Sequence, residues 1–378
     1  PGIIVFTHNE ILKGVIKKSK KINDLLQAST EKKKWLFGVH IQGDCRNLSS
    51  WPHKEWQSFF LWPNDGDLFL SNIPNKIIKD LTCVNFLPKT IENFKGLSKD
   101  IDIISVSKFS KIKNIDLTLK IFKALIDRNP SYKLLLIALK NPFKKKFFKN
   151  SREKYLEKVF KLANSLKVSK KYKNIKIIDP DIKREDLFPI PDEEIYKYIS
   201  RSKFHMLNSY REGVPRVIIE SLYLNTKVIF SNKLSFGLNK YMNNKNSFVY
   251  KENNENLEEI ADSIDKELKK NIDYSDEFLN LKDFQENESK VRLINFLNKI
   301  SSHFKKKLED KNHISWRLNN LKFRLCSHFR KADHQILKNE KNFLKWFKIV
   351  NEDENYFDEK YHHIFKIDKI DIIFEARY

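Results

Sequence analysis

Short apolar runs alternate with amphipathic stretches through the middle of the chain. Apolar runs of strand length occupy residues 102–106, 134–138, 175–178, 204–207 and 228–230. Apolar positions at helical spacing follow them at residues 117–125, 155–166, 195–199, from 215 onward, and at 257–268. This alternation predicts an α/β domain with a parallel, doubly wound sheet, in which ligands bind at the carboxyl ends of the strands.

The segment before this region is less regular. Val15, Ile22 and Leu26 predict one helix. Candidate strands lie at residues 3–6, 35–41, 59–62, 68–70 and 84–87. These elements indicate a smaller α/β domain at residues 1–97, followed by the larger domain at residues 98–285.

The last part of the chain is mainly helical in pattern. Residues 291–308 and 318–325 carry apolar positions at helical spacing, and a strand-like run follows at residues 370–374. Trp346 and Phe347 lie between them and favour packing over ligand contact. We therefore predict that residues 286–378 form a helical C-terminal extension.

The chain is strongly basic, with 72 Lys and Arg against 49 Asp and Glu and a net charge of +23. Lysine, asparagine, isoleucine and phenylalanine are abundant together and the lysines are spread along the chain, so compositional bias is the favoured explanation. Attraction to phosphate ligands or to an anionic membrane surface is the second explanation. Nucleic acid is the least favoured partner, because no Arg-rich arm or aromatic-interleaved binding motif is present.

Cysteine usage and hydropathy indicate a compartment. Cys45, Cys83 and Cys326 are far apart and form neither a disulfide framework nor a metal-binding spacing, which favours a reducing environment. No apolar run reaches the roughly 18–20 residues of a membrane-spanning helix. The sequence therefore predicts a cytoplasmic protein, and its charge extends this to peripheral attachment on the inner face of a membrane.

The segment SYREGVPRVIIE at residues 209–220 carries the candidate chemistry. It follows a predicted strand, and Pro215 suits the first position of a helix because it lacks the amide hydrogen that is unpaired there. Gly213 lets the backbone approach a ligand closely, and the amides of a helix start favour an anion such as a pyrophosphate. Glu212 in the loop and Glu220 in the helix add carboxylates, which can accept hydrogen bonds from vicinal hydroxyls.

Each glutamate also has a structural interpretation. Glu220 lies four residues after Arg216 and can form an ordinary ion pair on the helix face, although in the weaker orientation. Glu212 can simply stabilise the positive end of the helix dipole. Spacing alone leaves both interpretations open.

The same segment resembles the E-x7-E signature of the family 4 (group 1) retaining glycosyltransferases, with Glu212 and Glu220 at its two glutamates. The resemblance continues in order along the larger domain. Residues 106–114 resemble the family's V-G-R-L…K-G phosphate segment, with Lys108 and Lys113 at its basic positions. Three further segments resemble the helix before the signature, the E-A-x-x-x-G-x-P-V-I segment and the N-G-x-x-V turn: residues 191–199, 220–229 and 244–249.

Several positions depart from the family pattern. Asn225 stands in place of a glycine, which is a mild change because asparagine tolerates the left-handed conformation of a helix cap. Lys227 replaces a proline. Glycine is also replaced at Ser107, Asn114 and Ser247. The first domain is much shorter than the family's, and the family's glycine-rich loop after the first strand is not visible.

The resemblance implies a GT-B fold with two Rossmann-like domains, of which the N-terminal one is reduced here. It also implies transfer of a sugar from a nucleotide-diphosphate sugar to a hydroxyl of a glycan or lipid-linked glycan, with retention of configuration, as in polysaccharide biosynthesis. No cofactor and no metal ion is implied. Glu220 would hold the ribose and Glu212 the donor sugar, while the basic residues and helix amides would stabilise the leaving diphosphate. The implied donor-binding residues are Lys108, Lys113, Gly213, Val214, Pro215, Arg216 and Glu220.

His40, in the segment GVHIQG, resembles the family's N-domain histidine that faces the donor sugar. Glu212 and His40 are therefore the implied catalytic residues. A structural strand histidine is the favoured alternative for His40. For the whole chain, a non-catalytic nucleotide-sugar-binding or scaffold protein with the same fold is the second hypothesis, and a basic nucleic-acid-binding protein is the third.

Three other groups of residues are weaker candidates. Asp65 and Asp67 form the D-x-D of the other major glycosyltransferase fold, but they follow a Trp-Pro-Asn sequence that favours a turn. His362 and His363 have no carboxylate or cysteine at metal-ligand spacing. His205 lies in a predicted strand and is expected in the core.

Overall fold

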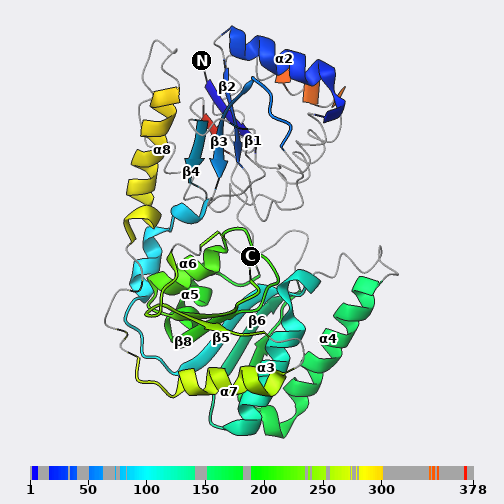
Figure 1. Ribbon diagram of the computed structural model, residues 1–378, viewed down its shortest axis with the longest axis vertical. Coiled ribbons are helices and arrows are strands. Elements are labelled where there is room, and N and C mark those ends of the chain that lie inside the picture. The colour runs from blue at the N-terminus through cyan, green and yellow to red at the C-terminus, as the bar shows by residue number, and fades with distance from the viewer. Residues whose placement is uncertain are drawn as a thin grey trace. The chain divides into compact units, whose positions relative to one another are not determined.

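The computed structural model places the chain in two compact units, drawn in Figure 1. The first comprises Pro1–Pro88 with Lys282–Arg377, and the second comprises chiefly Lys89–Leu281. The structure describes residues 2–6, 17–32, 35–40, 51–62, 73, 77–81, 83–140, 151–181, 189–234, 237–238, 241–252, 256–272, 274, 278, 281–300, 340–341, 343–344, 347–348 and 370–372.

A six-stranded parallel sheet forms the centre of the second unit, in the order β10-β9-β8-β5-β6-β7. Its strands are β5 (Ile101–Lys108), β6 (Leu134–Leu139), β7 (Ile175–Ile178), β8 (Ser202–Leu207), β9 (Lys227–Ser231) and β10 (Ser247–Tyr250). The chain builds the sheet outward in one direction from β5 and then in the other from β8. This is the predicted doubly wound order.

Helices pack against the sheet through the apolar positions that predicted them. Ile121 and Leu125 of one helix and Ile264 of another are fully buried in the same core as the strands, because a one-faced helix must cover its apolar stripe. The helices of this unit are α3 (Ile115–Arg128), α4 (Ser151–Val168), α5 (Asp192–Ser200), α6 (Arg216–Tyr223) and α7 (Leu257–Leu268).

One strand of this sheet escaped the sequence pattern. β10 is a four-residue strand at one edge of the sheet, and the sequence indicated only a turn there. Val249 is 47% exposed and Phe248 is half-buried, so this strand lacks the continuous apolar run of its buried neighbours. Edge strands have a neighbour on one side only, and their sequence signal is correspondingly weak.

The first unit contains a five-stranded parallel sheet in the order β11-β1-β2-β3-β4. Its strands are β1 (Gly2–Phe6), β2 (Trp35–His40), β3 (Gln57–Trp62), β4 (Ile78–Asp80) and β11 (Ile370–Ile372). Four of the predicted strands are confirmed as β1, β2, β3 and β11. The predicted strand at 68–70 lies outside the described residues.

The predicted strand at residues 84–87 is wrong, because Cys83–Asn85 forms a 3-10 helix. Phe86 beside it is fully buried, so the apolar run serves packing and not a sheet. Asn85 donates from Nδ2 to the carbonyl of Asp283 at 2.9 Å. β4, a short half-buried strand, was not predicted.

Helix α2 (Lys20–Glu31) begins at the N-cap Ser19, whose hydroxyl accepts from the amide of Ile22 at 3.2 Å. It buries Ile22 and Leu26, two of the residues that predicted it. None of the described helices has the length and apolarity that crossing a membrane requires.

The described pieces of residues 286–378 complete the first unit. Helix α8 (Glu286–Ile300) buries Leu293 and Leu297 in one core with residues of β2 and β3. β11 pairs with β1 through Ile3 and Ile370. Phe347 is buried as predicted and stacks on Phe343, with ring centroids 6.2 Å apart. These segments therefore belong to the first unit, although the sequence suggested an appended extension.

Candidate functional site

β5 and β8 are neighbours in the second sheet, with Ile104 paired to His205. The chain leaves their carboxyl ends toward opposite sides of the sheet, since β6 lies beyond β5 and β9 lies beyond β8. Two loops start there, at residues 109–114 before α3 and at 208–215 before α6. In doubly wound sheets this switch point is where ligands bind.

An ion pair joins the two loops. Lys113 donates from Nζ to Oε1 of Glu212, and the two side chains are 18% and 11% exposed. The backbone amide of Tyr210 also donates to the carbonyl of Ile112 at 3.0 Å. The sequence predicted Lys113 and Glu212 for the site, and the structure adds that they are direct partners. Both keep some accessible surface, so a ligand can reach them.

Asn114 turns the first loop into α3. It has φ 48° and ψ 44°, in the left-handed region, and its amide donates to the carbonyl of Lys111 at 3.2 Å. Asn225 has φ 52°. Asparagine thus adopts the conformation that glycine would take at both positions, which confirms the prediction for Asn225. The turn directs the amino end of α3 to the same edge as the loops, where its amides favour anions.

Buried hydrogen bonds support these loops from behind. Asn208 donates from Nδ2 to Oγ1 of Thr118 at 3.0 Å and accepts at Oδ1 from the hydroxyl of Tyr250 at 2.7 Å. Burial raises the pKa of Tyr250, so its hydroxyl stays protonated and donates. The network ties β8 to α3 and β10. Sequence reasoning missed Asn208 and Tyr250, whose partners lie far away along the chain.

The second loop ends at Pro215, which is the N-cap of α6 and not its first helical residue as predicted. Gly213 and Val214 before it are half-buried, and the carbonyl of Gly213 accepts from the amide of Gly237 at 2.7 Å. The helix thus begins one residue later than predicted, and its amino end still lies directly after the second loop.

Glu220 is fully buried inside α6. Its Oε1 lies 2.8 Å from Nε of Arg216, and the two side chains are 0% and 4% exposed. The hydroxyl of Tyr196 donates to the same oxygen at 3.3 Å, and Nη2 of Arg216 donates to that hydroxyl at 3.2 Å. The structure therefore contains the ion pair given above as the structural interpretation. The ribose role of Glu220 stays a prediction, and Tyr196 is a partner that the sequence did not suggest.

Two further predicted residues lie at strand ends. Lys108 is the last residue of β5 and is half-buried, at the edge that carries the loops. His40 is the last residue of β2 in the first unit and is 1% exposed. A Cβ at Gly38, two residues earlier, would lie 2.2 Å from the Phe59 ring, so glycine is needed beside His40 for packing. A role of His40 toward the donor sugar stays a prediction.

His205 lies in the core, as expected. Its Nε2 accepts from the amide of Val106 at 3.3 Å, and its Nδ1 lies 2.6 Å from Oγ of Ser221. Ser221 donates its own hydrogen to the carbonyl of Val217 at 2.7 Å, so Nδ1 must carry the imidazole proton. Burial lowers the pKa of His205 to about 3, and the ring is neutral at physiological pH.

The two motifs with metal-binding potential, at Asp65 and Asp67 and at His362 and His363, lie outside the described residues. Within the described part of the chain, no three His, Cys, Asp or Glu side chains are grouped to hold a metal ion.

Tyr210, beside Glu212, was not singled out by the sequence, yet it is 51% exposed in the second loop.

Residues 186–305 match the family model for glycosyl transferases group 1. The matched segment begins before α5 and contains both Glu212 and Glu220. This segment is therefore similar to the group 1 glycosyl transferases, and the fold of the chain is of the GT-B type. No curated protein matches the chain.

Two solved structures share the fold. An alpha,alpha-trehalose-phosphate synthase (UDP-forming) from Burkholderia xenovorans has 11% identity and a TM-score of 0.51, over 74% of this chain and 70% of that one. The N-terminal domain of Candida albicans trehalose-6-phosphate phosphatase has 12% identity and a TM-score of 0.50, over 80% and 72%. A TarM variant from S. aureus has 14% identity and a TM-score of 0.48, over 72% of this chain. The chain spans about half of the TarM chain, 54% of its length.

Proposed function

We propose that this chain transfers a sugar from a nucleotide-diphosphate sugar to a hydroxyl acceptor, with retention of configuration. The observation that carries the proposal is the ion pair between Lys113 and Glu212 at the switch point of the sheet. It brings a cation and a carboxylate together at the edge where the amino ends of α3 and α6 supply backbone amides. A diphosphate needs the cation and amides, and sugar hydroxyls need the carboxylate.

The residues of the two loops then have distinct roles. Lys108, Lys113 and the backbone amides of Gly213, Val214 and Arg216 stabilise the charge that builds on the leaving diphosphate. When the donor binds, Glu212 gives up its ion pair with Lys113 and accepts hydrogen bonds from the hydroxyls of the donor sugar. Glu220 likewise gives up its ion pair with Arg216 and accepts hydrogen bonds from the ribose hydroxyls. The positive charge comes from lysines and amides, so the proposed reaction needs neither metal ion nor cofactor. His40 is the other residue that the family resemblance proposes as catalytic.

The acceptor is proposed to be a glycan or a lipid-linked glycan. Four lysines at the start of α2 are exposed and form a basic surface on the first unit: Lys17, Lys18, Lys20 and Lys21. Such a surface favours peripheral attachment to an anionic membrane, on the cytoplasmic side. A second lysine cluster of the sequence, at residues 305–307, lies outside the described residues.

The second function is non-catalytic binding of a nucleotide sugar, which the short first domain motivates. The pairing of Glu220 with Arg216 and Tyr196 weighs against ribose binding in either function, because a ribose must displace these bonds. Turnover distinguishes the two functions, because a binding protein retains nucleotide affinity without releasing free diphosphate.

The test is a thermal-shift panel of nucleoside diphosphates and their sugars, followed by a product assay with the best ligand. UDP comes first, since the trehalose-phosphate synthase that shares the fold is UDP-forming. Lys113→Met should weaken diphosphate binding by about tenfold, because a charge-assisted hydrogen bond is lost. Lys158→Met, at an exposed site on α4, is the matched control. Absence of any stabilising nucleotide would overturn the proposed function.

A further inference from the structure

Two buried serine hydroxyls lie in the loops at the switch point of the second sheet. Ser110 is 7% exposed and Ser209 is 2% exposed. Within the part of the chain that the structure describes, the Oγ atom of neither serine has a hydrogen-bond partner. Each serine comes two residues after the end of its strand, Lys108 in β5 and Leu207 in β8. The two hydroxyls therefore belong to the same carboxyl edge of the sheet, one in each loop.

Ser110 stands where a serine hydroxyl ordinarily caps a helical turn. It is the N-cap of the 3-10 helix Lys111–Lys113, and its carbonyl accepts from the amide of Lys113 at 3.1 Å. A serine in this position commonly accepts an amide hydrogen at Oγ, yet Ser110 makes no side-chain cap bond. Its hydroxyl therefore contributes no hydrogen bond to the start of this turn.

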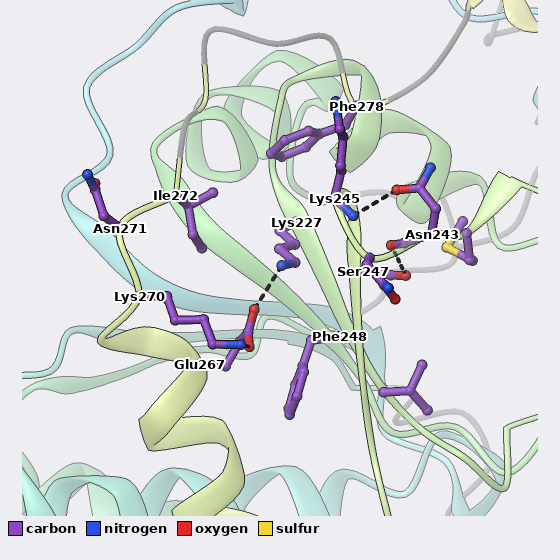
Figure 2. A pocket seen from close by; sticks show the side chains of 13 residues that line it. Lys227, Asn243, Lys245, Ser247, Phe248, Glu267, Lys270, Asn271, Ile272 and Phe278 are labelled. Carbon is purple, nitrogen blue, oxygen red and sulfur yellow. Dashed lines mark hydrogen bonds and ion pairs between the residues drawn. The ribbon is translucent and has the colours of Figure 1, made fainter.

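Two other buried serines of the second unit illustrate the usual pairing. Ser221 of α6 donates to a backbone carbonyl at 2.7 Å. At the amino edge of the sheet, Ser247 at the start of β10 donates to the carbonyl of Asn243 at 2.8 Å, and Lys227 pairs with Glu267 (Figure 2). Native proteins pair most buried polar atoms, because an unpaired one costs folding free energy. The unpaired hydroxyls at the carboxyl edge therefore indicate a partner from outside the chain.

The surroundings of the two hydroxyls suit an anion. Ser110 lies three residues before Lys113, and Ser209 lies three residues before Glu212, and the ion pair of Lys113 and Glu212 joins the loops. The amino ends of α3 and α6 follow the loops and supply backbone amides to the same edge. Serine hydroxyls rotate freely enough to donate to a ligand, and their hydrogen bonds to charged phosphate oxygens are strong. A diphosphate is the partner that matches these groups.

We propose that Ser110 and Ser209 donate hydrogen bonds to the diphosphate of the donor, one from each loop. Both oxygens are buried, so the ligand reaches them when Glu212 gives up Lys113 and the loops separate. Binding then supplies the hydrogen-bond partners that folding does not, which recovers the free energy that the unpaired hydroxyls cost. The proposal rests on the proposed function, because it uses the same diphosphate and the same opening of the ion pair.

The test is calorimetric titration of the full chain with UDP, inorganic pyrophosphate and uridine. Ser110→Ala and Ser209→Ala should each bind UDP and pyrophosphate about tenfold more weakly, because one charge-assisted hydrogen bond is lost. Uridine has no phosphate, so its affinity should stay at the wild-type value. The melting temperature of both variants should stay the same or rise, since alanine removes an unpaired hydroxyl.

Ser247→Ala is the matched control. It removes a paired serine hydroxyl at the opposite edge, so its melting temperature should fall while UDP binds as in the wild type.

Wild-type affinity for UDP in both serine variants, or an equal loss in the control, would overturn the serine contacts and leave the proposed function standing. An equal loss for uridine would show a general distortion of the site and also overturn them. If the wild type binds pyrophosphate but not UDP, and both substitutions weaken that binding, the proposed function is wrong and the serine contacts are supported. Binding of neither ligand would overturn both.

Discussion

Arg216 and Glu220 form an ion pair within α6, with Nε 2.8 Å from Oε1 and both side chains almost completely buried. The hydroxyl of Tyr196 contacts both residues. This triad gives Glu220 a structural role whatever else it does. Binding of a ribose at Glu220 would require the carboxylate to change partners, so stability and nucleotide affinity must be measured together.

Glu220→Gln should reduce the free energy of unfolding by about 3–5 kcal/mol, because Arg216 is left charged and buried without its counterion. Glu259→Gln, on the exposed face of α7, is the control and should change stability little. Urea denaturation measures both. Replacing Arg216 and Glu220 together by leucine should recover much of the loss. A Glu220→Gln protein as stable as the control would contradict the importance of the pair.

Substitutions of Glu212 and Glu220 should change different kinetic parameters. Glu220 is assigned to ribose contacts that exist before and during reaction, so Glu220→Gln should raise KM and weaken nucleotide binding. Glu212 is assigned to the transferred sugar, so Glu212→Gln should lower kcat and leave nucleotide affinity near that of the wild type. Each change should cost about ten- to a hundredfold, the value of a charge-assisted hydrogen bond. Steady-state kinetics, at temperatures below the thermal unfolding of each variant, measure these changes in KM and kcat. If both variants bind and turn over like the wild type, Glu220 is only a partner of Arg216.

His205 should make stability fall on acidification. Burial lowers its pKa in the folded state to about 3, below the ordinary value near 6.5, so the unfolded chain binds the proton first. The contribution is therefore fully present above pH 6.5 and is lost progressively as the pH falls toward 3. Between pH 7.5 and 5.5 the wild type should lose about 1.4 kcal/mol more than His205→Gln. Equal losses in urea titrations at the two pH values would show that another group controls the slope.

Activity should survive chelation. The proposed phosphate site uses lysines and backbone amides, so preincubation with EDTA should leave the rate nearly unchanged. The same product assay, with and without EDTA, provides the measurement. Complete loss that Mn²⁺ or Mg²⁺ restores would contradict this expectation and return attention to Asp65 and Asp67.

Anionic membranes should bind the chain weakly. Each exposed lysine near such a surface contributes on the order of 1 kcal/mol, screened by salt. Sedimentation at low salt should recover more protein with anionic than with neutral liposomes. Replacing the four lysines at the start of α2 by glutamine should reduce that difference. Equal, negligible binding to both liposomes would leave the positive charge as compositional bias.

The sequence by itself determined most of the elements of the second unit and the neighbourhood of its site. Buried parallel strands need continuous apolar runs and their covering helices need apolar residues at helical spacing, so both periods are visible in the chain. Residues 106–114 and 209–220 could be placed at strand ends for the same reason. The sequence did not predict the strands β4 and β10, which are short or lie at an edge. It wrongly predicted a strand at residues 84–87, an apolar run that packs without joining a sheet.

Only the tertiary structure decided which of these segments meet. Lys113 and Glu212 are 99 residues apart in the chain, and they pair because β5 and β8 are neighbours. The tail joins the first unit because β1 has an open edge for β11 and β3 has an apolar face for α8. The spacing along the helix allowed Glu220 to bind either a ligand or Arg216. In the structure Glu220 is buried beside Tyr196 and pairs with Arg216. The local hydrophobic pattern indicates which side chains a segment buries, whereas the contact partners of a residue depend on which segments the fold brings together.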